Sequence, residues 1–94
     1  MESLSGYRYK WIVFWYELLG TCFLCFSVVI SGGNTFAVAG ALFALTLIFG
    51  PISGAHFNPG FSVAVYVKEI KSEHSLEMLA IYVMAEVIGA LLGT

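Results

Sequence analysis

Three long apolar runs, separated by short polar segments, dominate the pattern of the chain. They lie at about residues 11–30, 35–52 and 76–93. Each run is close to the ~20 residues that a helix needs to cross the hydrocarbon core of a bilayer. A fourth apolar stretch, Phe61–Val67, is too short to cross. The pattern therefore predicts an all-α membrane protein with three transmembrane helices.

The first run could instead be the apolar part of a secretory signal peptide. The basic residues Arg8 and Lys10 precede the run, as basic residues precede that part of a signal peptide. The apolar part of a signal peptide has only ~7–15 residues and is followed by a small-residue cleavage site. The run here is longer, and no A-x-A-like site follows it. We therefore expect a retained transmembrane helix.

Glycine and proline indicate where the other helices begin and end. Residues 31–35 read SGGNT, which is a turn by composition. Gly50-Pro51 is expected to end the second helix, because proline lacks an N–H group and restrains the residue before it. The third long helix is expected to begin after residues 72–75 and to end at Gly93.

Residues 53–68 combine a loop containing glycine and proline with a short helix. Asn58 is a suitable N-cap and Pro59 a suitable first helical residue, so a helix is predicted over Pro59–Lys68. This helix is ~15 Å long, half the hydrocarbon thickness. Its charged end belongs in water, which places Asn58 near the bilayer midplane. Non-helical backbone at that depth is tolerated where water wets it, so the segment predicts a re-entrant half-helix beside a water-filled path.

Composition supports the membrane interpretation and excludes several classes of protein. Of the 94 residues, 60% are hydrophobic and 11% charged, whereas about 25% are charged in a soluble domain. The net charge of −2 excludes the basic surface that nucleic-acid binding requires. The length leaves no room for a separate soluble domain, so residues 1–94 are expected to form a single membrane domain.

The basic residues predict the orientation of the chain. Two of them precede the first run, two lie between the second and third, and the SGGNT turn is uncharged. Lys and Arg are enriched in cytoplasmic loops, so a multi-pass chain with a cytoplasmic N-terminus is predicted. These residues are Arg8, Lys10, Lys68 and Lys71.

A resemblance to a known family lies in the loop before the short helix, which reads SGAHFNP over residues 53–59. This string resembles the first signature loop of the aquaporin, or major intrinsic protein, family. ELLGT at 17–21 and AEVIGA at 85–90 resemble the first and third helices of that family. The resemblance covers nearly the whole chain but only the N-terminal half of a typical member. It implies half of a passive channel for water, with glycerol or other small neutral solutes as further candidates.

The resemblance also implies roles for individual residues. Asn58 would donate its side-chain amide to a passing water molecule. The carbonyl groups of Gly54, Ala55 and His56 would accept hydrogen bonds from successive waters. Glu17 would be a buried carboxylate that anchors the loop by hydrogen bonds rather than a group that faces the permeant water.

Other positions of the pore agree with the family only in part. Pro59 begins the half-helix, but Gly60 stands where the family usually has alanine. Val38 aligns with the second-helix position of the narrow filter and replaces an aromatic residue, which implies a wider filter. Glu86 stands where glutamine is more usual, and our hypothesis is that a protonated Glu86 replaces the amide. The chain contains neither a second Asn-Pro-Ala loop nor a filter arginine after it.

Three further patterns favour packing over chemistry. His56 could be a metal ligand or a proton relay, but no Cys, His or acidic cluster surrounds it in the sequence. Cys22 and Cys25 have redox spacing, yet they lie in an apolar helix, which favours reduced thiols. Gly89 and Gly93 allow a close helix approach, either within the bundle or between subunits. We expect no metal, no cofactor, no catalytic residue and hence no enzyme.

The expected partners are the lipid bilayer and the permeating solute. The family resemblance implies a homotetramer, or else a missing second half. A truncated, non-conducting subunit that associates with full-length relatives is the alternative. A dual-topology homodimer is a third possibility, which the one-sided basic residues disfavour. The sequence stops at Thr94 just as the third helix would leave the membrane, which suggests an incomplete chain.

Overall fold

A computed structural model describes residues 6–68 and 73–94 of the chain, and all regular structure in these two ranges is α-helical. Three of the four helices are long and apolar enough to cross a membrane, which confirms the predicted fold class. The helices are α1 (Gly6–Ser31), α2 (Thr35–Ser53), α3 (Pro59–Lys68) and α4 (Glu73–Gly93).

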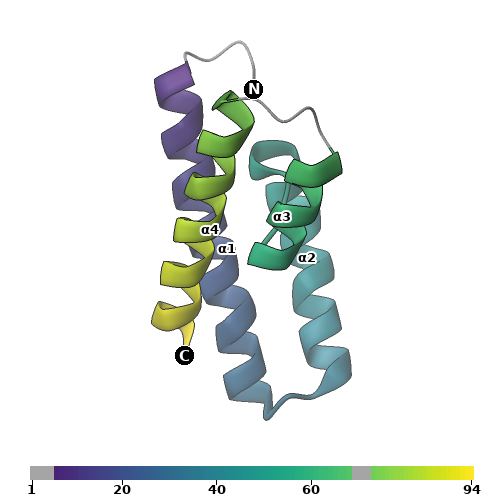
Figure 1. The fold of residues 1–94 in the computed structure, drawn as a ribbon. Helices are drawn as coiled ribbons and strands as arrows, with labels where there is room; N and C mark the ends of the chain where they lie inside the picture. The colour runs from purple at the N-terminus through teal and green to yellow at the C-terminus, as the bar shows by residue number, and fades with distance from the viewer. Residues whose placement is uncertain (1–5, 69–72) are drawn as a thin grey trace.

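The three long helices form a bundle to which α3 is added (Figure 1). Helix α1 packs against both α2 and α4, and α3 packs against α4. The bundle is 40 Å long, close to the ~40–45 Å thickness of a bilayer with its headgroups. Figure 1 shows that α3 begins near mid-height and ends at the end of the bundle where α4 begins. With its 10 residues, or ~15 Å, α3 thus spans little more than a third of the length of the bundle.

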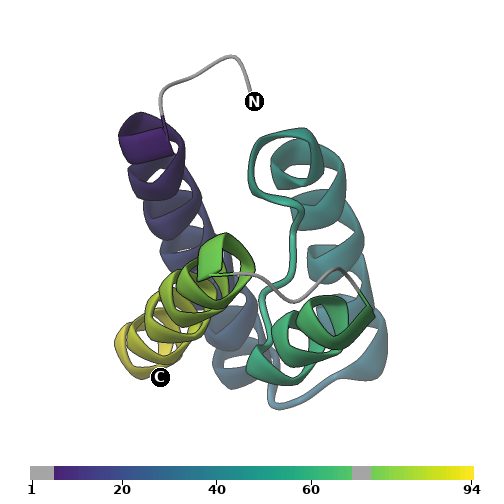
Figure 2. The same cartoon turned by 45° about the horizontal axis from the view of Figure 1, so that its top comes forward.

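The segment between α2 and α3 reverses the direction of the chain inside the bundle. Figure 2 shows that it returns from the end of α2 along the inner side of the bundle to the start of α3. The bounds of α3, Pro59–Lys68, are those expected from the Asn-Pro cap. That this segment is re-entrant in a membrane remains a prediction.

The expected end of α2 at Gly50-Pro51 was wrong, because the helix continues through Pro51 to Ser53. A proline in the last turn removes a single intrahelical hydrogen bond, which a helix tolerates better there than in its middle. The helix is ended instead by Gly54, which has a left-handed φ of 89° and donates its N–H to the Gly50 carbonyl at 2.9 Å. Helices α1 and α4 also begin a few residues earlier than predicted.

Two glycines of α4 allow it to approach α1 closely. A Cβ atom at Gly89 would lie 2.3 Å from the backbone oxygen of Leu18, and one at Gly93 would lie 2.3 Å from that of Cys22. Real Cβ atoms do not approach a backbone oxygen so closely, so both positions require glycine. The pair therefore acts within the bundle, which decides between the two alternatives left open by the sequence.

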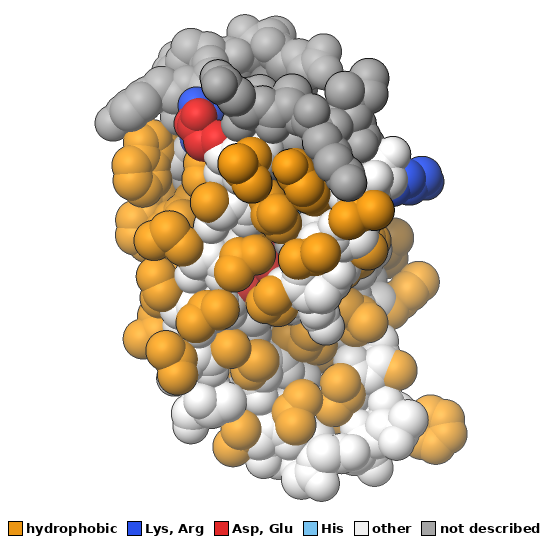
Figure 3. Space-filling model, viewed as in Figure 1, with side chains coloured by type: hydrophobic (Ala, Val, Ile, Leu, Met, Phe, Trp, Pro, Cys, Tyr) orange, Lys and Arg blue, Asp and Glu red, His pale blue; other side chains and the backbone are white. Residues whose placement is uncertain are grey.

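Apolar side chains cover the outside of the bundle. Phe36 is 88% exposed and Leu91 is 72% exposed, far more than large apolar residues of a soluble domain. On the face shown in Figure 3, hydrophobic side chains extend over most of the height, and most of the charged side chains lie near one end. This surface suits the hydrocarbon core of a bilayer.

Candidate functional site

The carboxylate of Glu17 holds the loop of residues 54–58 from α1. Its Oε1 accepts the backbone N–H of Phe57 at 2.8 Å, and its Oε2 accepts that of His56 at 3.2 Å. Ser53 Oγ donates to the same Oε2 at 2.5 Å. Glu17 is fully buried. Three donors around one buried carboxylate fix the path of the loop, as a loop anchor would.

The loop backbone takes up a conformation that L-residues rarely adopt. Ala55 has a φ of 52° and Phe57 a φ of 54°, both in the left-handed region. Each such residue costs about 1–2 kcal/mol when it carries a side chain. The hydrogen bonds to Glu17 offset this cost because they hold the N–H groups of residues 56 and 57 toward α1.

The loop carbonyl groups face away from this anchor. In a trans peptide the N–H and C=O groups point in opposite directions, and the structure has no cis peptide in the described residues. The carbonyls of Ala55 and His56 therefore point away from Glu17. Within the described parts of the chain, no protein donor bonds to the carbonyl oxygen of Gly54, Ala55 or His56.

Asn58 caps α3 and leaves its amide nitrogen outward. Its Oδ1 accepts the N–H of Gly60 at 2.7 Å and of Phe61 at 3.4 Å. Because the oxygen faces the helix, the NH₂ group of the same amide points the other way, and no acceptor among the described residues binds it. Asn58, Pro59 and Gly60 are all exposed. The start of α3 therefore presents two N–H donors beside the loop carbonyls.

The imidazole of His56 lies between two aromatic rings. It stacks on Tyr82 with ring centroids 4.0 Å apart and on Phe61 at 5.1 Å. Its Nδ1 lies 2.9 Å from Ser62 Oγ. Burial lowers the pKa of His56, although the nearby Glu17 carboxylate opposes this shift. The ring is therefore neutral at pH 7, as a residue that packs the loop against α3 and α4 would be.

An apolar cluster packs the loop against α1 and α2. Phe57 packs with Phe49 at a centroid distance of 5.9 Å, and Phe49 with Tyr16 at 5.4 Å. Gly20 of α1 leaves the space for the Phe57 ring, because a Cβ there would lie 2.1 Å from its Cε1 atom. The ring of Phe57 thus fastens the loop to both α1 and α2.

A second buried carboxyl group lies on the α4 side of the loop. Glu86 is 1% exposed, and Ser62 Oγ lies 3.1 and 3.0 Å from its two oxygens. Tyr82, also on α4, donates its hydroxyl to the Ser53 carbonyl. Neither Ser62 nor Tyr82 was predicted as a site residue. The sequence signal for Ser62 is a serine one turn after the cap in an otherwise apolar run.

Val38 lies apart from these residues. It is half-buried in the first turn of α2. Fifteen residues separate it from the loop-bearing end of that helix, or ~22 Å of helix. The structure therefore places Val38 toward the opposite end of the bundle, and its role in a filter stays a prediction.

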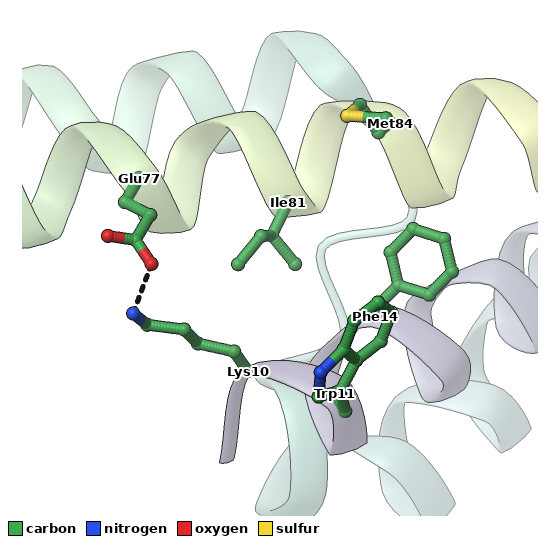
Figure 4. A pocket seen from close by; sticks show the side chains of 6 residues that line it. All are labelled: Lys10, Trp11, Phe14, Glu77, Ile81 and Met84. Atoms are coloured by element: carbon green, nitrogen blue, oxygen red, sulfur yellow. Dashed lines mark ion pairs between the residues drawn. The ribbon is translucent and has the colours of Figure 1, made fainter. Parts of the chain in front are cut away.

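The bundle also carries an apolar groove away from the loop (Figure 4). It has a volume of about 390 Å³ and lies between α1 and α4. Lys10 and Glu77 form an ion pair at one end of it. The groove is lined by Lys10, Trp11, Phe14, Glu77, Ile81 and Met84.

No group of three His, Cys, Asp or Glu side chains in the described residues could hold a metal, and both cysteines are free.

Comparisons with known proteins identify the family to which the chain belongs. A family model described as Major intrinsic protein matches residues 27–94. The chain is 38% identical to Aquaglyceroporin AqpS of Rhizobium meliloti over 93 residues, which cover 83% of this chain and 39% of that protein. It is 39% identical to the Aquaglyceroporin of Toxoplasma gondii over 57 residues, covering 61% of this chain and 21% of that protein.

A third relative, Glycerol uptake facilitator protein-like 6 of Lactiplantibacillus plantarum, is 34% identical over 88 residues, covering 83% of this chain and 38% of that protein. The chain thus spans about two fifths of the length of two of these relatives and 21% of the third. No solved structure matches it significantly. The matching family consists of membrane channels rather than enzymes. The chain, with its three apolar helices, belongs to the major intrinsic protein family.

Proposed function

We propose that the chain forms the N-terminal half of a transmembrane channel for water and small neutral solutes such as glycerol. The observation that carries this proposal is the start of α3. There the outward amide of Asn58 lies next to loop carbonyls that no protein donor satisfies in the described residues. Donors and acceptors side by side suit the passage of a neutral hydroxylic molecule, which both donates and accepts hydrogen bonds.

Each part of this site has a task in permeation. The carbonyls of Gly54, Ala55 and His56 accept hydrogen bonds from successive waters, and Asn58 donates to the oxygen of the water that reaches α3. The N-terminus of a helix carries about half a positive charge. The start of α3 therefore disfavours cations and protons at the point where water is bound.

Val38 supports a range of solutes wider than water. An aliphatic side chain at this filter position occupies less space than the aromatic residue of strict water channels. Two of the relatives are named aquaglyceroporins and the third a glycerol uptake facilitator protein-like protein. We therefore propose that glycerol passes as well as water.

A complete pore requires a second half, because the site is open on one side. Asn58, Pro59 and Gly60 are exposed at the start of α3. We propose that a further segment with its own half-helix covers them, and that pores assemble as a homotetramer. The alternative, a non-conducting subunit that only associates with full-length relatives, is favoured by the same exposure, since such a subunit would offer the same surface.

We also propose that the N-terminus is cytoplasmic. Helix α1 begins, α3 ends and α4 begins at the same end of the bundle (Figure 1). Lys10 and Lys68 belong to this end, as the enrichment of basic residues on the cytoplasmic side requires. Protease digestion of a tag before Met1 in sealed inside-out vesicles tests this orientation.

Osmotic shrinkage of proteoliposomes tests the proposed conduction. The chain is reconstituted alone, and together with the part of Aquaglyceroporin AqpS that follows the matched region. We expect the two halves together to pass water and glycerol faster than empty vesicles. If vesicles that contain both co-purified halves shrink no faster than empty vesicles, the channel proposal is wrong. If the chain is inert alone and also silences full-length relatives, the subunit alternative is correct.

Two aspartate variants separate capping from permeation. Asn58→Asp keeps an oxygen that caps α3 but removes the amide donors, so we expect conduction to fall roughly tenfold, as a barrier ~1.4 kcal/mol higher implies. Asn34 also caps a helix, since it accepts the Ala37 N–H at 2.9 Å at the start of α2. Asn34→Asp is therefore the matched control and should leave conduction unchanged.

A further inference from the structure

Two buried carboxyl groups meet beside the loop, and the proposed permeation pathway uses neither directly. Glu17 of α1 is 0% exposed and Glu86 of α4 is 1% exposed. Their carboxyl groups lie within hydrogen-bond reach of each other. Two ionised carboxylates have only acceptor oxygens and would repel each other in a buried site, whereas a proton on one of them turns the contact into a hydrogen bond.

The surrounding donors indicate which of the two groups carries the proton. Glu17 accepts the Ser53 hydroxyl and the backbone N–H groups of His56 and Phe57. These three donors favour its ionised form. Glu86 has fewer donors, namely the single hydroxyl proton of Ser62 and a contact with the backbone of Asn58. The proton therefore belongs on Glu86.

Ser62 extends this arrangement to the half-helix. Its Oγ lies about equally far from both Glu86 oxygens, at 3.1 and 3.0 Å, and 2.9 Å from Nδ1 of His56. A serine hydroxyl has one proton to give but two lone pairs to accept with. It therefore joins α3 to α4 and to the loop at the same time, one turn after Asn58.

We propose that Glu86 is a positioning residue that acts in its protonated form, donating to Glu17 and binding Ser62, so that it fixes the start of α3 between α1 and α4. In this role the acid replaces a neutral amide: it donates one hydrogen bond and accepts another. Glu86 does not touch the permeating molecule. It acts through Ser62 and Asn58.

Loss of this proton should release the half-helix. When hydroxide removes the proton from Glu86, two negative charges face each other in a buried site. Among the described residues, the other titratable groups nearby offer no positive charge, because His56 is neutral at pH 7 and Tyr82 donates its hydroxyl to the Ser53 carbonyl. Lys10 is paired with Glu77 at the end of the bundle. Repulsion therefore acts between α1 and α4, beside Ser62.

The proton itself does not depend on the channel proposal, whereas its consequence does. If the chain conducts as proposed, conduction falls reversibly in the alkaline range, and Glu86→Gln removes this dependence while it preserves conduction at pH 7. Glutamine keeps one donor and one acceptor in the same place. A failure to conduct at any pH would speak against the proposed function and would leave the proton to be tested on its own.

Infrared spectroscopy of the reconstituted chain tests the proton directly. All six acidic residues of the sequence are glutamates, so ¹³C-labelled glutamate shifts the carbonyl band of any protonated side-chain acid. We expect such a band at pH 7 and its loss as the pH rises. The absence of a glutamate-sensitive band at pH 7 would overturn the proposal with the wild-type chain alone.

Two variants show which glutamate gives rise to the infrared band. Glu86→Gln should abolish it, and Glu77→Gln is the matched control on the same helix, which should retain it because Glu77 is paired with Lys10 and ionised. A band that persists in Glu86→Gln would place the proton on another glutamate and overturn the assignment. These spectra require no conduction, so their outcome is independent of the proposed function.

Discussion

At the scale of single residues, one carboxylate organises the candidate site. From the middle of α1, Glu17 accepts two backbone N–H groups of the loop and the hydroxyl of Ser53 at the end of α2. A charged side chain in the middle of a transmembrane helix costs about 3 kcal/mol on insertion scales, so it persists where it has partners. The donors also need Glu17, since a buried N–H or O–H without an acceptor costs about 1–3 kcal/mol.

Replacement of Glu17 by alanine should therefore destabilise the fold more than most single substitutions. Three donors lose their acceptor, so we expect a loss of about 3 kcal/mol or more in unfolding free energy, measured by denaturation in detergent micelles. Glu77→Ala, which breaks the ion pair with Lys10 at the end of the bundle, should cost at most about 1 kcal/mol. Similar losses in both variants would contradict the anchoring role.

His56 makes stability depend on pH in the acidic range. Because burial lowers its pKa, the folded chain binds this proton less readily than the unfolded chain does. The stability that the neutral ring contributes is therefore present above its ordinary value near 6.5 and is lost as the pH falls through that value toward the lower folded pKa. Melting temperatures across this range should fall for the wild type and vary less for His56→Gln. Parallel curves would contradict the assignment.

Roles that follow from adjacent residues could be predicted from the sequence. Contacts between residues far apart in the sequence could not. Asn58 and Pro59 are adjacent, so their capping role follows from the sequence, and the resemblance suggested Glu17 as the anchor. The contact of Ser62 with Glu86 joins residues 24 positions apart. Nothing in the spacing indicates it. The left-handed backbone of Ala55 was equally hidden, because such conformations are expected at glycine.

At the scale of elements, the packing of α1 against α4 depends on two glycines. Alanine at Gly89 or Gly93 would place a methyl group 2.3 Å from a backbone oxygen of α1. We expect each substitution to cost about 1–3 kcal/mol, because the helices must separate. Gly40→Ala in α2 is the control, since no atom lies within 4 Å of its Cβ position.

The control should change stability by no more than about 1 kcal/mol, and it should stabilise, because alanine has the higher helix propensity. Unfolding in detergent micelles measures all three variants. If Gly89→Ala and Gly93→Ala are as stable as Gly40→Ala, the close approach of α1 and α4 is not needed for the fold.

The existence of the elements and both ends of α3 could be predicted, but the end of α2 and the starts of α1 and α4 could not. Long apolar runs predicted three helices because length and hydropathy are properties of the chain itself. The end of α2 depends on Gly54 and on the tolerance of a last helical turn for Pro51. The residue at which α2 ends is therefore set by hydrogen bonds of the folded chain. The dipeptide Gly50-Pro51 alone does not indicate these hydrogen bonds.

At the scale of the whole molecule, the three long helices and one short helix of the described residues leave a polar site open at mid-height. The loop anchor and the apolar cluster fix this site from inside, whereas the start of α3 is exposed. In the proposed channel, a further segment encloses the pore on this exposed side. The proposed channel therefore depends on the depth of α3 in the bilayer.

Spin labels on α3 measure that depth most directly. Phe61→Cys and Val67→Cys lie on exposed positions near the two ends of α3, in a background in which Cys22 and Cys25 are replaced by alanine. Collisions of each label with oxygen and with a water-soluble nickel complex report its depth. We predict that the label at position 61 lies near the bilayer midplane and the label at 67 near the headgroups. Both labels at headgroup depth would contradict the account.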